Sequence, residues 1–199
     1  MITSKDKDLL RHVEDFKFIT IEQAYKMLYP KMDKGYEYAR QRIQRLCKIE
    51  KRLKSIHDTA TKKKIFIDID SKITKVPLHR IYTMNLYCCL VGSGYEVEKF
   101  DLEKEWDDGN VRSDAFCVFL TTDGNQKYRF RLLIETNTSN NKLNLSKYDG
   151  IRNELLSACN NQLPRIVLID DRDHKNYDTK LYQIIRLDYK ISNLASLLI

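Results

Sequence analysis

The sequence is notable first for what it lacks. No run of apolar residues reaches the length of a membrane span, and the first seven residues are polar, so we expect neither a transmembrane helix nor a signal peptide. There is no internal repeat and no low-complexity tail. The cysteines are odd in number and have no CxxC spacing, which argues against a disulfide framework and against a zinc cluster (Cys47, Cys88, Cys89, Cys117 and Cys159). These absences predict a protein of the reducing cytoplasm without membrane attachment.

The charge is unevenly distributed along the 199 residues. Residues 1–80 carry 20 Lys and Arg against 11 Asp and Glu, whereas residues 81–199 carry 15 against 17. The net charge of +7 therefore belongs to the first part of the chain, which favours a polyanionic partner for that part. A merely soluble lysine-rich surface is the alternative.

The basic part contains three predicted helices, at 4–16, 21–28 and about 36–49. Thr20 and Gln23 have the spacing of a capping box that begins the second helix. In the third helix, Ala39, Ile43 and Leu46 recur at helical spacing and should face a core. Its other face offers side chains that can contact base edges and phosphates in a major groove: Arg40, Gln41, Gln44, Arg45 and Lys48.

Two short strands, 53–57 and 64–69, follow the third helix and enclose a polar tip at 58–63 that contains Lys62 and Lys63, and Lys64 begins the second strand. Three helices followed by a basic hairpin resemble a winged helix-turn-helix, in which the third helix enters the DNA groove and the hairpin touches the backbone. We therefore predict a DNA-binding domain at residues 1–70 whose partner is double-stranded DNA. A winged-helix fold used for protein contacts is the alternative. Residues 71–76 read as a polar linker, and the second domain is expected at 77–199.

The second domain is organised around residues 111–137. Two predicted strands, 111–120 and 127–135, are joined by a turn at Asp123-Gly124-Asn125, where glycine supplies the positive φ that a tight hairpin needs. With Gly124 and Asn125 as turn residues, Asp114 lies opposite Glu135. Like charges paired on a sheet repel, so either a divalent cation lies between them or the pair is exposed at a sheet edge.

The remaining predictions complete this domain. A helix is expected at 78–91, a strand at 95–100, an acidic loop or short helix at 101–110, a helix at 140–159 and a buried strand at 165–169. The residues 181–187 form either a helix or a strand. The fold class is thus α+β, with an N-terminal winged helix-turn-helix and an α/β domain built on a mixed central sheet.

The order helix, strand, hairpin, helix, strand, with Arg112-Ser113-Asp114-Ala115 and Glu135-Thr136-Asn137 at the hairpin, resembles the PD-(D/E)XK restriction-endonuclease-like fold. With the N-terminal domain in front, the whole chain resembles the replication-relaxation family and the related MobC-type conjugative relaxases. The resemblance implies that Asp114 and Glu135 bind Mg²⁺ or Mn²⁺. Lys147 and Tyr148 match a lysine–tyrosine region of the family loosely.

The chain departs from that family pattern at one catalytic position. Asn137 stands where the nuclease motif has lysine, and an amide supplies neither a positive charge nor a base. Lys147 is the candidate to replace the missing lysine. An ordinary loop with a helix cap is the alternative interpretation of Asn137.

Three functions are therefore open: a metal-dependent nicking relaxase of a plasmid or conjugative transposon that acts at an origin of transfer or replication, a catalytically inactive accessory protein that contacts other relaxosome proteins, and a transcriptional regulator with a ligand-sensing second domain.

Overall fold

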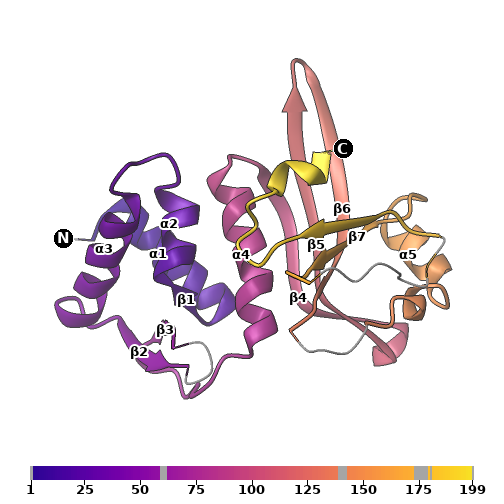
Figure 1. The fold of residues 1–199 in the computed structure, drawn as a ribbon. Coiled ribbons are helices and arrows are strands. Elements are labelled where there is room, and N and C mark those ends of the chain that lie inside the picture. Colours follow the sequence, from indigo (N-terminus) through magenta and orange to yellow (C-terminus); the bar gives the residue numbers. More distant parts are fainter. Residues whose placement is uncertain (1, 59–61, 139–142, 173–178, 180, 199) are drawn as a thin grey trace. The chain divides into compact units, whose positions relative to one another are not determined.

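The computed structural model describes residues 2–58, 62–138, 143–172, 179 and 181–198. The chain is an α+β protein that divides into two compact units, Met1–Leu78 and His79–Ile199 (Figure 1). Among the described residues, no helix combines the length and the apolar composition needed to cross a bilayer.

The first unit contains three helices and a small antiparallel sheet. The helices are α1 (Ser4–Phe16), α2 (Ile21–Leu28) and α3 (Gly35–Lys48). The sheet has the strand order β1-β3-β2, with β1 at Ile19–Thr20, β2 at Leu53–His57 and β3 at Lys64–Asp68. The tip of the β2–β3 hairpin, residues 59–61, lies outside the described residues.

Local sequence signals account for the helices of this unit. The Thr20 side chain accepts a hydrogen bond from the backbone N–H of Gln23, and the Gln23 side chain accepts one from the N–H of Thr20, which is the predicted capping box. Ala39, Ile43 and Leu46 are buried, so α3 has the predicted inner face.

The second unit is built on a mixed sheet with the order β4-β5-β6-β7-β8. The strands are β4 (Glu96–Trp106), β5 (Val111–Asp123), β6 (Gln126–Thr136), β7 (Arg165–Ile169) and β8 (Ile184–Leu187). The first three pair antiparallel, whereas β7 pairs parallel to β6 and β8 parallel to β7. The mixed sheet predicted from the sequence is confirmed.

Helices cover both faces of this sheet. Helix α4 (Leu78–Gly92) contributes Leu86 and Leu90 to a core that includes Ala115, Cys117 and Phe119 of β5. On the other face α5 (Arg152–Ala158) and the 3₁₀ turn η2 (Ser146–Tyr148) pack on the β5 and β6 residues that alternate along the strands with those of the first core. Two further 3₁₀ turns, η1 (Asp107–Gly109) and η3 (Leu194–Leu198), follow β4 and β8.

The hairpin register matches its prediction. Ala115 pairs with Ile134 and Phe119 with Phe130, and Gly124 has a φ of 57° in the turn. A positive φ is the conformation that glycine adopts without steric cost. The paired register ends at Ala115↔Ile134, and Asp114 and Glu135 are the next residues beyond it on the two strands.

Two predicted boundaries in the second unit are wrong. Residues 101–110 were expected in an acidic loop or short helix, but 101–106 continue β4, because they pair with β5 from Asp101↔Phe116 to Trp106↔Val111. The expected helix at 140–159 is α-helical only at Arg152–Ala158 among its described residues. The Ser146 hydroxyl donates to Asn144 Oδ1 at 2.7 Å, and such local bonds compete with helix formation. The segment 181–187, which was expected to form either a helix or a strand, contains the strand β8 (Ile184–Leu187).

Candidate functional site

The two predicted metal-ligating carboxylates lie on neighbouring strands at the same end of the sheet. Asp114 comes from the start of β5, and one of its oxygens, Oδ2, accepts a hydrogen bond from the Thr136 backbone N–H at 2.7 Å. Glu135 comes from the end of β6, and only 4% of its surface is exposed. The hairpin register predicted from the turn thus brings the pair together.

The structure adds Lys147 to this pair. Its Nζ lies 2.6 Å from Glu135 Oε1, and it also donates to the Arg112 carbonyl at 2.6 Å. The Lys147 side chain is 28% exposed, so its ammonium contacts both the buried carboxylate and solvent. Lys147 sits on η2 instead of on the long helix predicted for 140–159.

Tyr148 is a site residue that the sequence indicated only through its loose family match. It is fully buried, and its hydroxyl donates to the same Glu135 Oε1 that Lys147 contacts. The Tyr182 hydroxyl donates to the Tyr148 carbonyl at 2.8 Å, which helps to hold this turn against the sheet. One oxygen of Glu135 therefore accepts from two donors.

Burial dominates the protonation of this cluster. It raises the pKa of Asp114, and the Thr136 N–H offsets part of that rise. Burial also raises the pKa of Glu135 above its ordinary value; Lys147 opposes the rise and Asp114 adds to it. The pKa of Tyr148 is raised by burial and by the charge of Glu135. Burial thus disfavours the charged forms of both carboxyl groups, and a nearby cation would favour them.

Asn137 makes its polar contacts with a different group. Its Nδ2 donates to Asp170 Oδ2 at 2.8 Å, and its backbone carbonyl accepts from Arg172 Nη2 at 3.1 Å and from the Tyr189 hydroxyl. Arg172 Nε lies 3.0 Å from Asp170 Oδ1. The sequence did not predict this cluster, because it follows from the parallel pairing of Thr136 with Ile169, which places the residues after β6 and β7 side by side.

The side chains of this site provide some, but not all, of the ligands of a hard divalent cation. In the part of the chain that the structure describes, no three His, Cys, Asp or Glu side chains are arranged to hold a metal ion. However, Mg²⁺ in phosphoryl-transfer sites keeps several waters and needs only one or two carboxylates beside substrate phosphates. Asp114 and Glu135 supply two carboxylates whose burial favours a cation, so the residues present are compatible with such an ion.

The predicted DNA-contacting residues lie together in the first unit. Gln41 and Lys48 are exposed on α3, whereas Arg40, Gln44 and Arg45 are partly buried. Arg40 donates to both carboxylate oxygens of Glu37 in the same helix, at 2.8 and 2.5 Å.

Two more of these cations have acidic partners. Arg45 Nε lies 3.4 Å from Glu50, and Lys63 Nζ lies 3.7 Å from Glu22. Lys62 and Lys64 are exposed at the hairpin.

Comparisons of the chain with protein-family models, with curated proteins and with solved structures find no match.

Proposed function

We propose that this protein binds double-stranded DNA at an origin of transfer or replication of a mobile element and nicks one strand there with the help of Mg²⁺ or Mn²⁺. In this proposal the first unit is a winged helix-turn-helix and the second a PD-(D/E)XK-like nuclease domain. The observation that carries the proposal is the contact of Lys147 with Glu135, beside Asp114. This contact places one ammonium beside two carboxylates. The nuclease motif obtains the same set of groups from a lysine at position 137, where this chain has asparagine.

The first unit supports DNA binding through the arrangement of its polar side chains. Gln41 and Lys48 are exposed on α3, and Lys62 and Lys64 are exposed at the hairpin. The Arg40–Glu37 contact limits what Arg40 alone can offer, because a base edge must compete with a carboxylate that already engages the guanidinium. We therefore expect phosphate contacts to contribute more than base readout.

The second unit supports cleavage through three side chains. Asp114 and Glu135 would hold the cation, which would stabilise the charge that develops on the reacting phosphate. Lys147 would place its ammonium beside the same phosphate, since its Nζ is already between the Arg112 carbonyl and Glu135 and is reached by solvent. Tyr148 orients Glu135, because its hydroxyl donates to that carboxylate from a fully buried position.

Two observations favour the second candidate, an inactive accessory protein that contacts other relaxosome proteins. The amide of Asn137, at the usual lysine position, is engaged with Asp170. In addition, the Lys147–Glu135 ion pair neutralises part of the negative charge that would attract a metal ion. A structural ion pair would have this same appearance.

The two candidates differ in an assay of strand nicking. A supercoiled plasmid carrying the DNA that flanks the coding sequence is incubated with Mg²⁺ or Mn²⁺ and the wild-type protein, Asp114→Asn, Lys147→Met or the control Arg152→Gln. We expect open-circular product from the wild type and the control only. Arg152 is a suitable control because it is exposed on α5.

Metal binding is measured separately, as the rise in melting temperature with millimolar Mn²⁺. A ligand that binds only the folded form raises this temperature, and Asp114→Asn should lose the rise. A wild-type protein that shows neither nicking nor a rise would favour the accessory protein.

A further inference from the structure

Strand β6 is longer than the neighbour that covers one of its edges. β7 pairs with β6 only from Leu132↔Arg165 to Thr136↔Ile169, whereas β5 pairs with β6 down to Gln126. Within the described residues, the segment from Gln126 to Arg131 is therefore paired on the β5 side only. An unpaired strand edge presents backbone N–H and C=O groups that can bind another chain.

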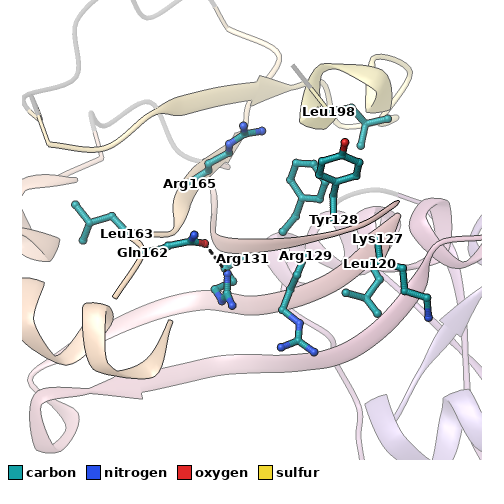
Figure 2. Close-up of a pocket in the computed structure, with 10 residues that line it drawn as sticks. Leu120, Lys127, Tyr128, Arg129, Arg131, Gln162, Leu163, Arg165 and Leu198 are labelled. Atoms are coloured by element: carbon teal, nitrogen blue, oxygen red, sulfur yellow. Dashed lines mark hydrogen bonds between the residues drawn. The ribbon is translucent and has the colours of Figure 1, made fainter. Parts of the chain in front are cut away.

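A pocket with a volume of about 790 Å³ surrounds this open edge (Figure 2). It is lined by ten residues, four of them basic and none acidic: Leu120, Lys127, Tyr128, Arg129, Phe130, Arg131, Gln162, Leu163, Arg165 and Leu198. Side chains alternate along a strand, so Arg129 and Arg131 extend to one side of β6 and Tyr128 to the other, where Arg165 also lies (Figure 2).

Arg131 and Arg165 keep their capacity to bind an anion. Arg131 donates to the neutral Gln162 side chain at 3.0 Å. Arg165 lies 5.2 Å from the centre of the Phe130 ring and donates to the Leu197 carbonyl at 2.8 Å, and neither partner is an acid.

Two cations of the pocket do have acidic partners on β4. Arg129 contacts Glu98 at 2.7 Å, and Lys127 contacts Glu96 at 3.7 Å. In both pairs the two side chains are at least 30% exposed. Ion pairs at such exposed positions contribute little, so a phosphate can displace the carboxylates.

We infer that this pocket binds single-stranded DNA that passes over the unpaired edge of β6, with phosphates on Arg129 and Arg131 on one side of the strand and a base stacked on Tyr128 on the other. Tyr128 is 44% exposed, so its side chain is accessible from solvent. A groove of positive charge beside an exposed aromatic ring is the usual arrangement for binding single strands. Duplex DNA keeps its bases stacked inside, and so it could not use Tyr128.

This inference goes beyond the proposed function. The pocket is separate from the carboxylate pair, because Arg131 precedes Glu135 by four residues on an extended strand, or about 13 Å. It also requires neither duplex binding by α3 nor cleavage at Asp114. An acidic peptide that adds a strand to the β6 edge is a different partner, and the test below distinguishes it.

The test measures the affinity of the full-length protein for a fluorescent oligothymidylate by anisotropy at several salt concentrations. Arg129→Gln/Arg131→Gln removes two phosphate contacts and should lower the slope of log K against log salt by about 1.4. Tyr128→Leu should weaken binding by about fivefold or more, whereas Tyr128→Phe should bind as the wild type does, because it keeps the ring. The control Arg152→Gln/Lys190→Gln removes the same charge from exposed positions outside the pocket.

The inference is overturned if the Arg129/Arg131 variant matches the charge control and Tyr128→Leu binds as tightly as Tyr128→Phe. It is also overturned, in favour of an acidic protein segment, if polyglutamate displaces the oligonucleotide and Tyr128→Leu has no effect. Duplex binding is measured on the same variants. If the wild-type protein does not bind duplex DNA, this result counts against the proposed function and leaves the oligothymidylate result unaffected.

Discussion

Replacing Lys147 with methionine removes the cation that contacts Glu135 and keeps most of the side-chain volume. In the wild type the two groups lie 2.6 Å apart, and the Glu135 side chain is 5% exposed. The variant leaves this carboxylate with the Tyr148 hydroxyl as its remaining side-chain partner among the described residues. The free energy of unfolding should therefore fall.

Two limits set the size of the loss. Removing one partner of a buried ion pair costs about 3–5 kcal/mol. Because Lys147 is partly exposed, the cost for this pair lies at or below the lower end of that range. The loss in the free energy of unfolding has an upper limit, because Glu135 can take up a proton instead of staying charged. Protonating a group with the ordinary pKa of 4.5 at pH 7 costs about 3.4 kcal/mol. We expect a loss of about 2–3 kcal/mol at pH 7.

The sign of the pH dependence follows from the raised pKa of Glu135. The folded protein binds this proton more tightly than the unfolded chain does, so stability falls as the pH rises from about 4.5 through the folded pKa. Without Lys147 the folded pKa rises further, because the ammonium no longer favours the charged form. The deficit of the variant should therefore be largest at pH 7 and should shrink towards pH 4.5.

Urea unfolding of both proteins at pH 7 and pH 5 measures this difference in stability. The comparison requires that the free energy of unfolding falls with urea concentration at the same slope in both proteins. Glu135→Gln/Lys147→Met removes both charges and should recover most of the loss, and Arg152→Met controls for loss of an exposed cation. A loss below about 0.5 kcal/mol that is equal at both pH values, as for an ordinary surface substitution, would refute the Lys147–Glu135 contact.

Two other substitutions test the first unit. Replacing the three hairpin lysines at 62–64 with glutamine should lower the salt slope of duplex binding by about 2.7 if each lysine meets a phosphate; an unchanged slope in a gel-shift titration would exclude that role. Gly35→Ala would place a Cβ 2.4 Å from the Tyr29 carbonyl oxygen, so we expect a loss of about 1–3 kcal/mol in urea unfolding. Gly150→Ala is the matched control, because its Cβ would have no neighbour closer than 4.0 Å.

The sequence by itself determined the features that depend on neighbouring residues. Helix α2 begins at the capping box of Thr20 and Gln23 because its hydrogen bonds span three residues. The register of the β5–β6 hairpin follows from its two-residue turn at Gly124, and extending it by one residue beyond Ala115↔Ile134 places Asp114 opposite Glu135. The carboxylate pair could therefore be predicted before any tertiary contact was known.

Tertiary structure decided the features that depend on distant partners. Residues 101–106 became a strand because β5 supplies their hydrogen bonds, and 184–187 became β8 because β7 does. Lys147 reaches Glu135 because η2 packs against the sheet, although the two lie twelve positions apart in the sequence. Sequence patterns report the preferences of adjacent residues, whereas the partner of a strand or of a buried charge is fixed only when the chain packs around one core.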